Sequence, residues 1–446
     1  MGITDRIRII SATALIACSV ALPHPVSGSD IDWQRITRLK DKAFLDYVRT
    51  LDLRGQEAID FWKKIPLNQA NRQVNRIFHK EAFSIYMNKY PRGRQKSGGG
   101  FKAGMGTAIQ GPISQQQLKL PFTNVYPMPE GPFGDPNRTY RIGYSIHGFS
   151  HPWLLSNAES AMWEADRHPN VELTLADAEF DNDKQVEQIN AWTREKLDGI
   201  LVWPMQEAPT GPPIAEATAA GIPTVTVDRM AGTRRVRSQV TGNFPANGAQ
   251  QGAYLIHRLI QETGEVKGNI LMIRKPPGST ADSMRTGHFL KVISYFPGLK
   301  ILGSRHNSSS RADSRRQVLE AFTEHPDIDV IFCTGAEQAM GAVAAVSEAG
   351  RWNSRGDGRR IIILSNDDLY EALLAMKQDK IAVTAPYTPL LGGLGLRVLL
   401  KSIAGEKIPR NVTTPDLPMI TREKQNIFGI ETMSIEEWLP YSYGRH

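Results

Sequence analysis

Eight side chains that could bind a small ligand stand after short apolar segments of the sequence. They are His147, Ser150, Trp153, Asp228, Arg229, Arg285, Glu337 and Asp367. A carboxylate accepts paired hydrogen bonds from neighbouring hydroxyl groups, and a guanidinium donates to ring and hydroxyl oxygens. An indole adds an apolar face on which a sugar ring can stack. The set predicts a site for a small polar ligand rich in hydroxyl groups, such as a sugar or a polyol.

Each of these residues also has a simpler structural explanation. An Asp or Ser at the start of a helix caps the helix more often than it binds a ligand. Asp367, together with Asp368, could cap the helix that follows it, and Glu337 could be a first-turn acid favoured by the helix dipole. The binding hypothesis therefore depends on several strand ends converging on one crevice.

The elements that would position these residues begin at residue 138. Short β-branched segments there alternate with amphipathic segments of helical periodicity. We predict strands at 140–144, 171–175, 199–202, 224–227, 269–273, 300–303, 330–333, 361–364 and 381–384. Repeated strand–helix units predict parallel sheets covered by helices on both faces. Because so many strands suit two sheets better than one, the predicted fold class is α/β with two doubly wound parallel-sheet lobes joined by a hinge. The ligand would bind in the crevice beyond the carboxyl ends of the strands.

The predicted lobes are interleaved in the sequence. We expect lobe 1 to comprise residues 138–243 and 386–420, and lobe 2 to comprise residues 244–385. Residues 421–446 are expected to form a C-terminal tail. Residues 30–137 are expected to form a helical extension followed by an arm rich in Gly and Pro.

The first 28 residues have the pattern of an export signal. Two arginines precede an apolar, uncharged stretch at 9–22, which ends at prolines before a small-residue cleavage site. An alternative is a lipoprotein signal, since residues 15–18 match the box in which Cys18 would be acylated after cleavage. Both alternatives predict a mature protein outside the cytoplasmic membrane, which in the lipoprotein case would be anchored through Cys18.

Composition and motifs argue against several other classes. The formal net charge of +7 is spread along the chain and does not indicate a nucleic-acid partner. No Gly-x-Ser-x-Gly elbow, Walker loop or convincing dinucleotide-binding glycine pattern is present, so we predict that the protein is not an enzyme and has no cofactor. His147 and His151 lack an obvious third ligand, so we expect no metal site. The second cysteine, Cys333, lies in a strand pattern and is expected in the core.

The chain from Tyr140 to about Ile420 resembles the type 1 periplasmic binding proteins, the ribose-binding protein among them. The likeness is carried by the stretches 222–229 (IPTVTVDR), 285–289 (RTGHF), 325–332 (HPDIDVIF) and 339–342 (AMGA), and by Asn366-Asp367 ahead of 379–382 (DKIA). The resemblance implies that Asp228 and Arg285 occupy ligand-binding positions and that Asp367 occupies a third.

The sequence also departs from that family pattern. The first-loop motif Asn-Asn-Pro-Phe-Phe is replaced here by the stretch from His147 to Trp153, and Gly335 stands where the family has a ligand-binding amide. A second such amide position falls near Pro386. These differences argue against ribose itself as the ligand. The first loop is more similar to the Lux-type periplasmic autoinducer receptor, which has Ser and Trp at the spacing of Ser150 and Trp153 but lacks Asp at the place of Asp228.

Two functions follow from the resemblance. The first is a solute-binding subunit of an ABC importer that closes on its ligand and presents it to a membrane permease. The second is a periplasmic receptor that signals to a membrane histidine kinase, which the long segment 30–137 favours because transport needs no such extension. A DNA-binding repressor can share this core but would need a helix-turn-helix headpiece, and the export signal and the glycine-rich arm argue against one.

Overall fold

The computed structural model describes residue 32, residues 34–35, residue 47, and residues 125–149, 152–414 and 417–444. The predicted export signal, the lipoprotein Cys18, most of the predicted extension and Ser150 lie outside the described residues. No helix in the described ranges is both long and apolar enough to span a membrane.

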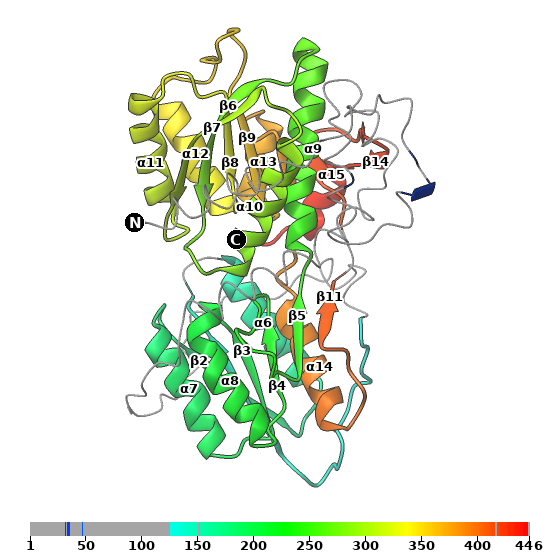
Figure 1. Cartoon of the computed structure of the whole chain (residues 1–446). Helices are drawn as coiled ribbons and strands as arrows, with labels where there is room; N and C mark the ends of the chain where they lie inside the picture. The colour runs from blue at the N-terminus through cyan, green and yellow to red at the C-terminus, as the bar shows by residue number, and fades with distance from the viewer. Residues whose placement is uncertain are drawn as a thin grey trace.

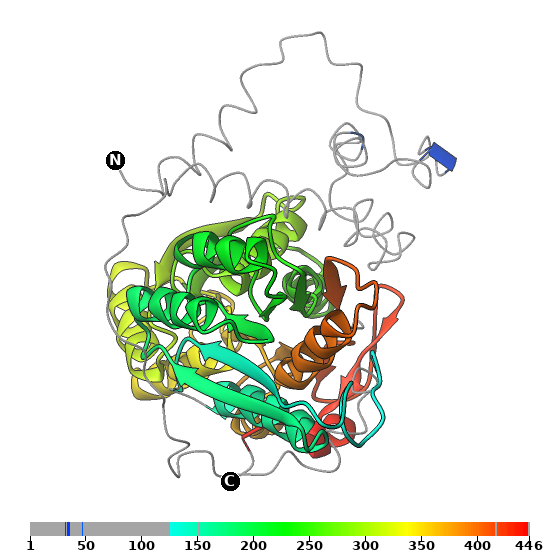
Figure 2. The ribbon, with the colours of Figure 1, turned by 90° about the horizontal axis from the view of Figure 1, so that it is seen from below.

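Two α/β lobes stand one above the other, and each is built on its own sheet (Figure 1). Lobe 1 contains β1 (Tyr140–Ile146), β2 (Val171–Asp177), β3 (Gly199–Trp203), β4 (Thr224–Val227), β5 (Ser238–Thr241), β11 (Asn411–Thr413), α6 (Pro152–Asp166), α7 (Asn182–Arg194), α8 (Glu207–Ala219) and α14 (Leu391–Ile403). The view from below shows helices on both sides of this sheet (Figure 2). The fully buried β3 and β4 agree with a parallel sheet that is covered on both faces.

Lobe 2 repeats this arrangement. It contains β6 (Gly268–Arg274), β7 (Leu299–His306), β8 (Val330–Cys333), β9 (Ile362–Asn366), β10 (Val383–Ala385), β12 (Ile420–Thr421), β15 (Met433–Ser434), α9 (Phe244–Thr263), α10 (Thr280–Ile293), α11 (Arg311–Glu324), α12 (Ala336–Glu348), α13 (Tyr370–Lys377) and α15 (Ile435–Trp438). A hairpin of β13 (Asn426–Ile427) and β14 (Ile430–Glu431) and the 3-10 turn η4 (Leu439–Tyr441) complete the chain. Neighbouring strands run β2-β1-β3-β4-β5 in lobe 1 and β7-β6-β8-β9-β10 in lobe 2, so the two sheets have the same order.

The predicted fold class is confirmed, and all nine predicted strands are present. The sequence analysis did not include β5, whose residues Ser-Gln-Val-Thr contain only one apolar side chain. Residues 421–444, which we expected to form a tail, contribute β15 to the second sheet and α15 to its cover. They are held there because Ile427, Ile435, Trp438 and Tyr443 are buried.

Residues 125–139 lie against lobe 1. Phe133 is buried and its ring stands edge-on to Tyr140, with the ring centroids 4.8 Å apart. The backbone N–H of Phe133 donates to Asn170 Oδ1 at 2.7 Å. The end of the predicted arm is therefore packed on the core through its apolar residues.

We expect the C-terminal residues to contribute to the stability of lobe 2 through Trp438. Its indole is 2% exposed and its Nε1 donates to Asp368 Oδ2 at 2.8 Å. Trp438→Ala should lower the free energy of unfolding by about 3–5 kcal/mol, because it removes a buried ring and leaves Asp368 without this donor. Urea denaturation measures the change, and Trp163→Ala, at a tryptophan that is 38% exposed, is the matched control. Equal small effects in both variants would show that the C-terminal segment is not part of the core.

Candidate ligand-binding crevice

Two aspartates occupy equivalent positions in the two lobes. Asp228 follows β4, the fourth strand of lobe 1 in chain order, and Asp367 follows β9, the fourth strand of lobe 2. The backbone N–H of Asp228 donates to Val240 O at 2.8 Å, and that of Asp367 donates to Ala385 O at 2.9 Å. Both residues have positive φ, at 65° and 71°. This conformation is uncommon outside glycine and tends to occur at functional sites, so the pair marks the crevice between the two sheets.

Arg285 and Asp367 form a buried ion pair on the lobe 2 side of the crevice. Arg285 lies on α10, is 1% exposed, and places Nη2 2.5 Å from Asp367 Oδ1. Its Nη1 donates to Thr334 O at 2.7 Å, and Asn247 Oδ1 lies 3.5 Å from Nη2. The structure therefore brings together two of the predicted residues, which lie 82 positions apart in the sequence.

Asp228 faces them from lobe 1 and is held by donors that the sequence analysis did not identify. Its Oδ1 accepts from the Tyr387 hydroxyl at 2.8 Å, and its Oδ2 accepts from Trp203 Nε1 at 2.9 Å. Arg229 Nε lies 3.7 Å from Oδ2. Burial raises the pKa of the Asp228 carboxyl, and Arg229, these donors and Arg285 oppose the shift.

An aromatic cluster joins the two sides. The Tyr387 ring stacks on Phe244, with ring centroids 4.4 Å apart, and also on Trp153, with centroids 5.7 Å apart. Trp153 also lies 5.1 Å from Trp203 and donates from Nε1 to Tyr387 O at 3.0 Å. The Arg285 guanidinium stands 5.0 Å from the ring centroids of Phe244 and Tyr387, within cation–π range. Trp153 is 5% exposed, so here its ring packs against the protein's own aromatic residues.

The other predicted residues differ in their surroundings. His147 is buried and stands edge-on to Trp203 at 4.4 Å, which places it beside the aromatic cluster. Glu337 lies in the first turn of α12, and its carboxylate binds Arg311 Nε at 2.5 Å. The structure thus does not bring Glu337 into the network around Asp228 and Arg285.

The sequence analysis missed several residues of the crevice, among them Trp203, Tyr387, Lys275 and Gln338. Trp203 is the last residue of β3 and Lys275 follows β6, so the strand-end criterion could have found both. Gln338 lies on α12, one turn beyond a strand end, and Tyr387 lies on a crossover between the lobes. No cluster of three His, Cys, Asp or Glu side chains suited to a metal occurs among the residues that the structure describes.

The lobes contact each other beside the crevice. The hydroxyl of Thr280, on α10 of lobe 2, donates to the Glu207 carboxylate on α8 of lobe 1 and accepts from Met230 N at 3.1 Å. Gln206 Nε2 donates to Pro277 O at 3.2 Å across the same boundary. Burial raises the pKa of Glu207 to about 7. These hydrogen bonds define a closed arrangement of the lobes.

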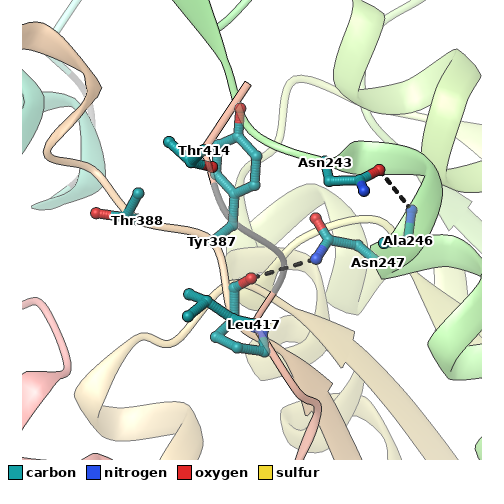
Figure 3. Close-up of a pocket in the computed structure, with 8 residues that line it drawn as sticks. Asn243, Ala246, Asn247, Tyr387, Thr388, Thr414 and Leu417 are labelled. Carbon is teal, nitrogen blue, oxygen red and sulfur yellow. Dashed lines mark hydrogen bonds between the residues drawn. The ribbon is translucent and has the colours of Figure 1, made fainter. Parts of the chain in front are cut away.

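A small pocket lies at the hinge, where three crossover segments meet (Figure 3). Asn243 and Asn247 line it from the crossover between β5 and α9 and from α9 itself. Tyr387 and Thr388 line it from the crossover between β10 and α14, and Thr414 from the one between β11 and β12. Asn247 Nδ2 donates to Pro386 O at 3.2 Å. The backbone N–H of Gly242 donates to the Tyr387 hydroxyl at 3.0 Å, and a Cβ at residue 242 would stand 2.3 Å from the Tyr387 ring. The Tyr387 side chain therefore ties the hinge to Asp228.

Two sheets of the same strand order, facing each other across a hinged crevice of buried polar side chains, define a two-lobed solute-binding protein. A family model described as a periplasmic binding protein domain matches residues 142–407. The chain belongs to this family, and its relatives place it among the type 1, ribose-binding-protein-like members.

Curated relatives and solved structures agree with this assignment. The ribose import binding protein of Bacillus subtilis is 22% identical over 62% of this chain and 86% of its own. The xylitol-binding protein of Mycolicibacterium smegmatis is 24% identical over 65% and 79%. An ABC transporter solute-binding protein from Bacillus halodurans with bound myo-inositol covers 69% of this chain and 99% of its own, with a TM-score of 0.60 and 22% identity. A Mycobacterium smegmatis protein in complex with β-D-fucofuranose covers 62% and 90%, with a TM-score of 0.57 and 28% identity.

We expect the closed arrangement to depend on Thr280. Thr280→Val keeps the side-chain shape but removes the hydroxyl that bridges Glu207 and Met230, at a cost of about 1–3 kcal/mol to the closed form. Small-angle X-ray scattering should show a larger radius of gyration for the ligand-free variant than for the wild type. Thr323→Val, on the exposed side of α11, is the control. An unchanged scattering profile for Thr280→Val would contradict a role for this contact in closure.

Proposed function

We propose that the protein binds a sugar, a polyol or a similar hydroxylated small molecule in the crevice and releases it by hinge opening. The observation that carries this proposal is the convergence of Asp228, Arg285 and Asp367 from both lobes on one buried position beside an aromatic cluster. Carboxylates and a guanidinium bind hydroxyl groups, and aromatic faces bind the C–H faces of a sugar ring. The arrangement suits binding rather than catalysis.

The names of the relatives support this ligand class. They include proteins for ribose, xylitol and allose, and the Mycobacterium smegmatis structure contains β-D-fucofuranose. The amide-to-glycine change at Gly335 and the second departure near Pro386 alter the surface that a ligand would meet. We therefore propose a ligand of the same class as these sugars and polyols, different from ribose.

We propose further that the closed, ligand-bound form delivers its ligand to the permease of an ABC importer. The relatives are described as import binding proteins and as solute-binding proteins of ABC transporters, which supports transport over signalling to a histidine kinase. The protein would act outside the cytoplasmic membrane after export through its N-terminal signal. Pull-down experiments with the ligand-bound protein as bait would distinguish the two partners. A permease encoded beside the gene should be retained if the protein serves transport, and a histidine kinase if it serves signalling.

A binding screen with site variants tests the proposal. Thermal-shift and calorimetric titration against pentoses, hexoses, inositols and polyols should find a ligand. Asp228→Asn and Arg285→Met should each weaken its binding by about 2–5 kcal/mol, because each change leaves a buried polar partner unmatched. Both variants must first retain the far-UV spectrum of the wild type.

Glu337→Gln is the discriminating control for the same titration. Its carboxylate binds Arg311 and stands outside the network around Asp228 and Arg285, so its loss should change the affinity for a neutral sugar or polyol by less than about threefold, as for a partly exposed ion pair. Wild-type affinity in Asp228→Asn and Arg285→Met, or a strong loss in Glu337→Gln, would overturn the site assignment.

A further inference from the structure

The crevice contains a lysine that the family resemblance did not assign. Lys275 directly follows β6, and its backbone N–H donates to Thr334 Oγ1 at 2.8 Å, at the end of the adjacent β8. Thr334 O in turn accepts from Arg285, so Lys275 and Arg285 are anchored on the same strand end. Within the described part of the chain, the Lys275 ammonium takes part in no ion pair.

The charges around Lys275 do not balance. Three aspartates interact electrostatically with Lys275, namely Asp367, Asp228 and Asp282, and each of them lies beside a guanidinium. The pairs are Arg285–Asp367 at 2.5 Å, Arg274–Asp282 at 2.6 Å and Arg229–Asp228 at 3.7 Å. Burial lowers the pKa of Lys275, and the Asp367 and Asp228 carboxylates oppose this shift. Lys275 therefore adds one positive charge beyond these three ion pairs.

A buried amide stands next to this ammonium. Gln338 is 0% exposed, and neither its Nε2 nor its Oε1 has a hydrogen-bond partner. A Cβ at residue 335 would lie 2.6 Å from Gln338 Oε1 and 2.8 Å from Lys275 Nζ. The absence of a side chain at Gly335 thus lets the two polar ends approach the same point. A buried amide without a partner is costly, so this one is suited to a ligand that satisfies it.

The helix that carries Gln338 adds to the positive potential. α12 has 13 residues, its N-cap is Gly335, and no side chain caps its first N–H groups. The N-terminal end of a helix favours a negative charge and offers backbone donors to it. Ammonium, amide and helix terminus therefore meet at one place, at the carboxyl end of β8.

We propose that the ligand is a hydroxylated molecule with one anionic group, such as a sugar acid, whose anion lies against Lys275, Gln338 and the first turn of α12. This inference rests on the proposed function, since the hydroxyl groups would bind at Asp228, Arg285 and Asp367. A carboxylate and a phosphate ester share the required chemistry. A carboxylate fits the single excess charge, and the experiment compares both.

Matched ligand pairs test the proposal on the full-length mature protein. Isothermal titration compares D-ribose with D-ribonate, D-glucose with D-gluconate, and D-galactose with D-galacturonate, with D-ribose 5-phosphate and D-glucose 6-phosphate as the phosphate arm. We expect at least one anionic member to bind ten times more tightly than its neutral partner. If only the sugar phosphates bound more tightly than their neutral partners, the anion site would be supported and the anionic group of the ligand would be a phosphate ester.

Substitutions at Lys275 separate a ligand contact from a structural role. Lys275→Gln should weaken binding of the preferred anion by 10- to 100-fold and leave binding of its neutral partner within threefold. Lys275→Arg should keep the preference for the anion. Lys300→Gln, which removes an exposed lysine of the same lobe, should change neither affinity. Gln338→Glu, which adds a negative charge at the proposed contact, should lower affinity for the anion more than for the neutral partner.

The outcomes distinguish this inference from the function on which it rests. Tighter binding of the neutral member in every pair would overturn the anionic ligand and leave the sugar-binding function in place. Equal weakening of both members by Lys275→Gln would also overturn it, because Lys275 would then be structural. If no sugar, polyol or acid bound at all, the proposed function itself would fail.

Discussion

The buried ion pair between Arg285 and Asp367 constrains the whole crevice. Taking both charges out of water costs free energy that their mutual attraction offsets only when the remaining donors and acceptors are also satisfied. The fold meets part of this demand with Thr334 O and Asn247 Oδ1, and with the aromatic faces of Phe244 and Tyr387. Arg285 Nε is buried and has no acceptor. A ligand oxygen could supply this acceptor.

The repeated strand order explains why polar groups of both lobes meet. In each lobe the chain turns sharply after the fourth sequential strand and places an aspartate in the left-handed region, at Asp228 and at Asp367. The chain leaves the carboxyl end of β5 for lobe 2 and the carboxyl end of β10 for lobe 1. The carboxyl ends of the two sheets therefore face each other, and the crevice between them collects side chains that are up to 234 residues apart in sequence.

Much of this architecture follows from local sequence patterns. The nine predicted strands and the two-lobed division required only apolar β-branched runs alternating with helical periodicity, and Asp228, Arg285 and Asp367 followed from strand ends and family likeness. Local patterns failed where tertiary contacts decide. The alternative of Asp367 and Asp368 as helix caps is not observed, since α13 has no side-chain cap hydrogen bond, and Asp368 instead accepts from Tyr387 N and Trp438 Nε1.

Tyr387 illustrates what no local pattern could supply. It lies 159 residues from Asp228, on a crossover whose sequence carries no strand or helix signal, yet its hydroxyl binds both Asp228 Oδ1 and the Gly242 N–H. A carboxylate has about four acceptor positions, so the donors from Tyr387 and Trp203 leave room on Asp228 for a ligand hydroxyl. Because the Tyr387 backbone belongs to the hinge, a rotation of the hinge would move the Tyr387 hydroxyl relative to the Asp228 carboxylate. The proposed ligand contact at Asp228 would therefore be coupled to the angle between the lobes through one side chain, and the lack of a side chain at Gly242 leaves space for the Tyr387 ring.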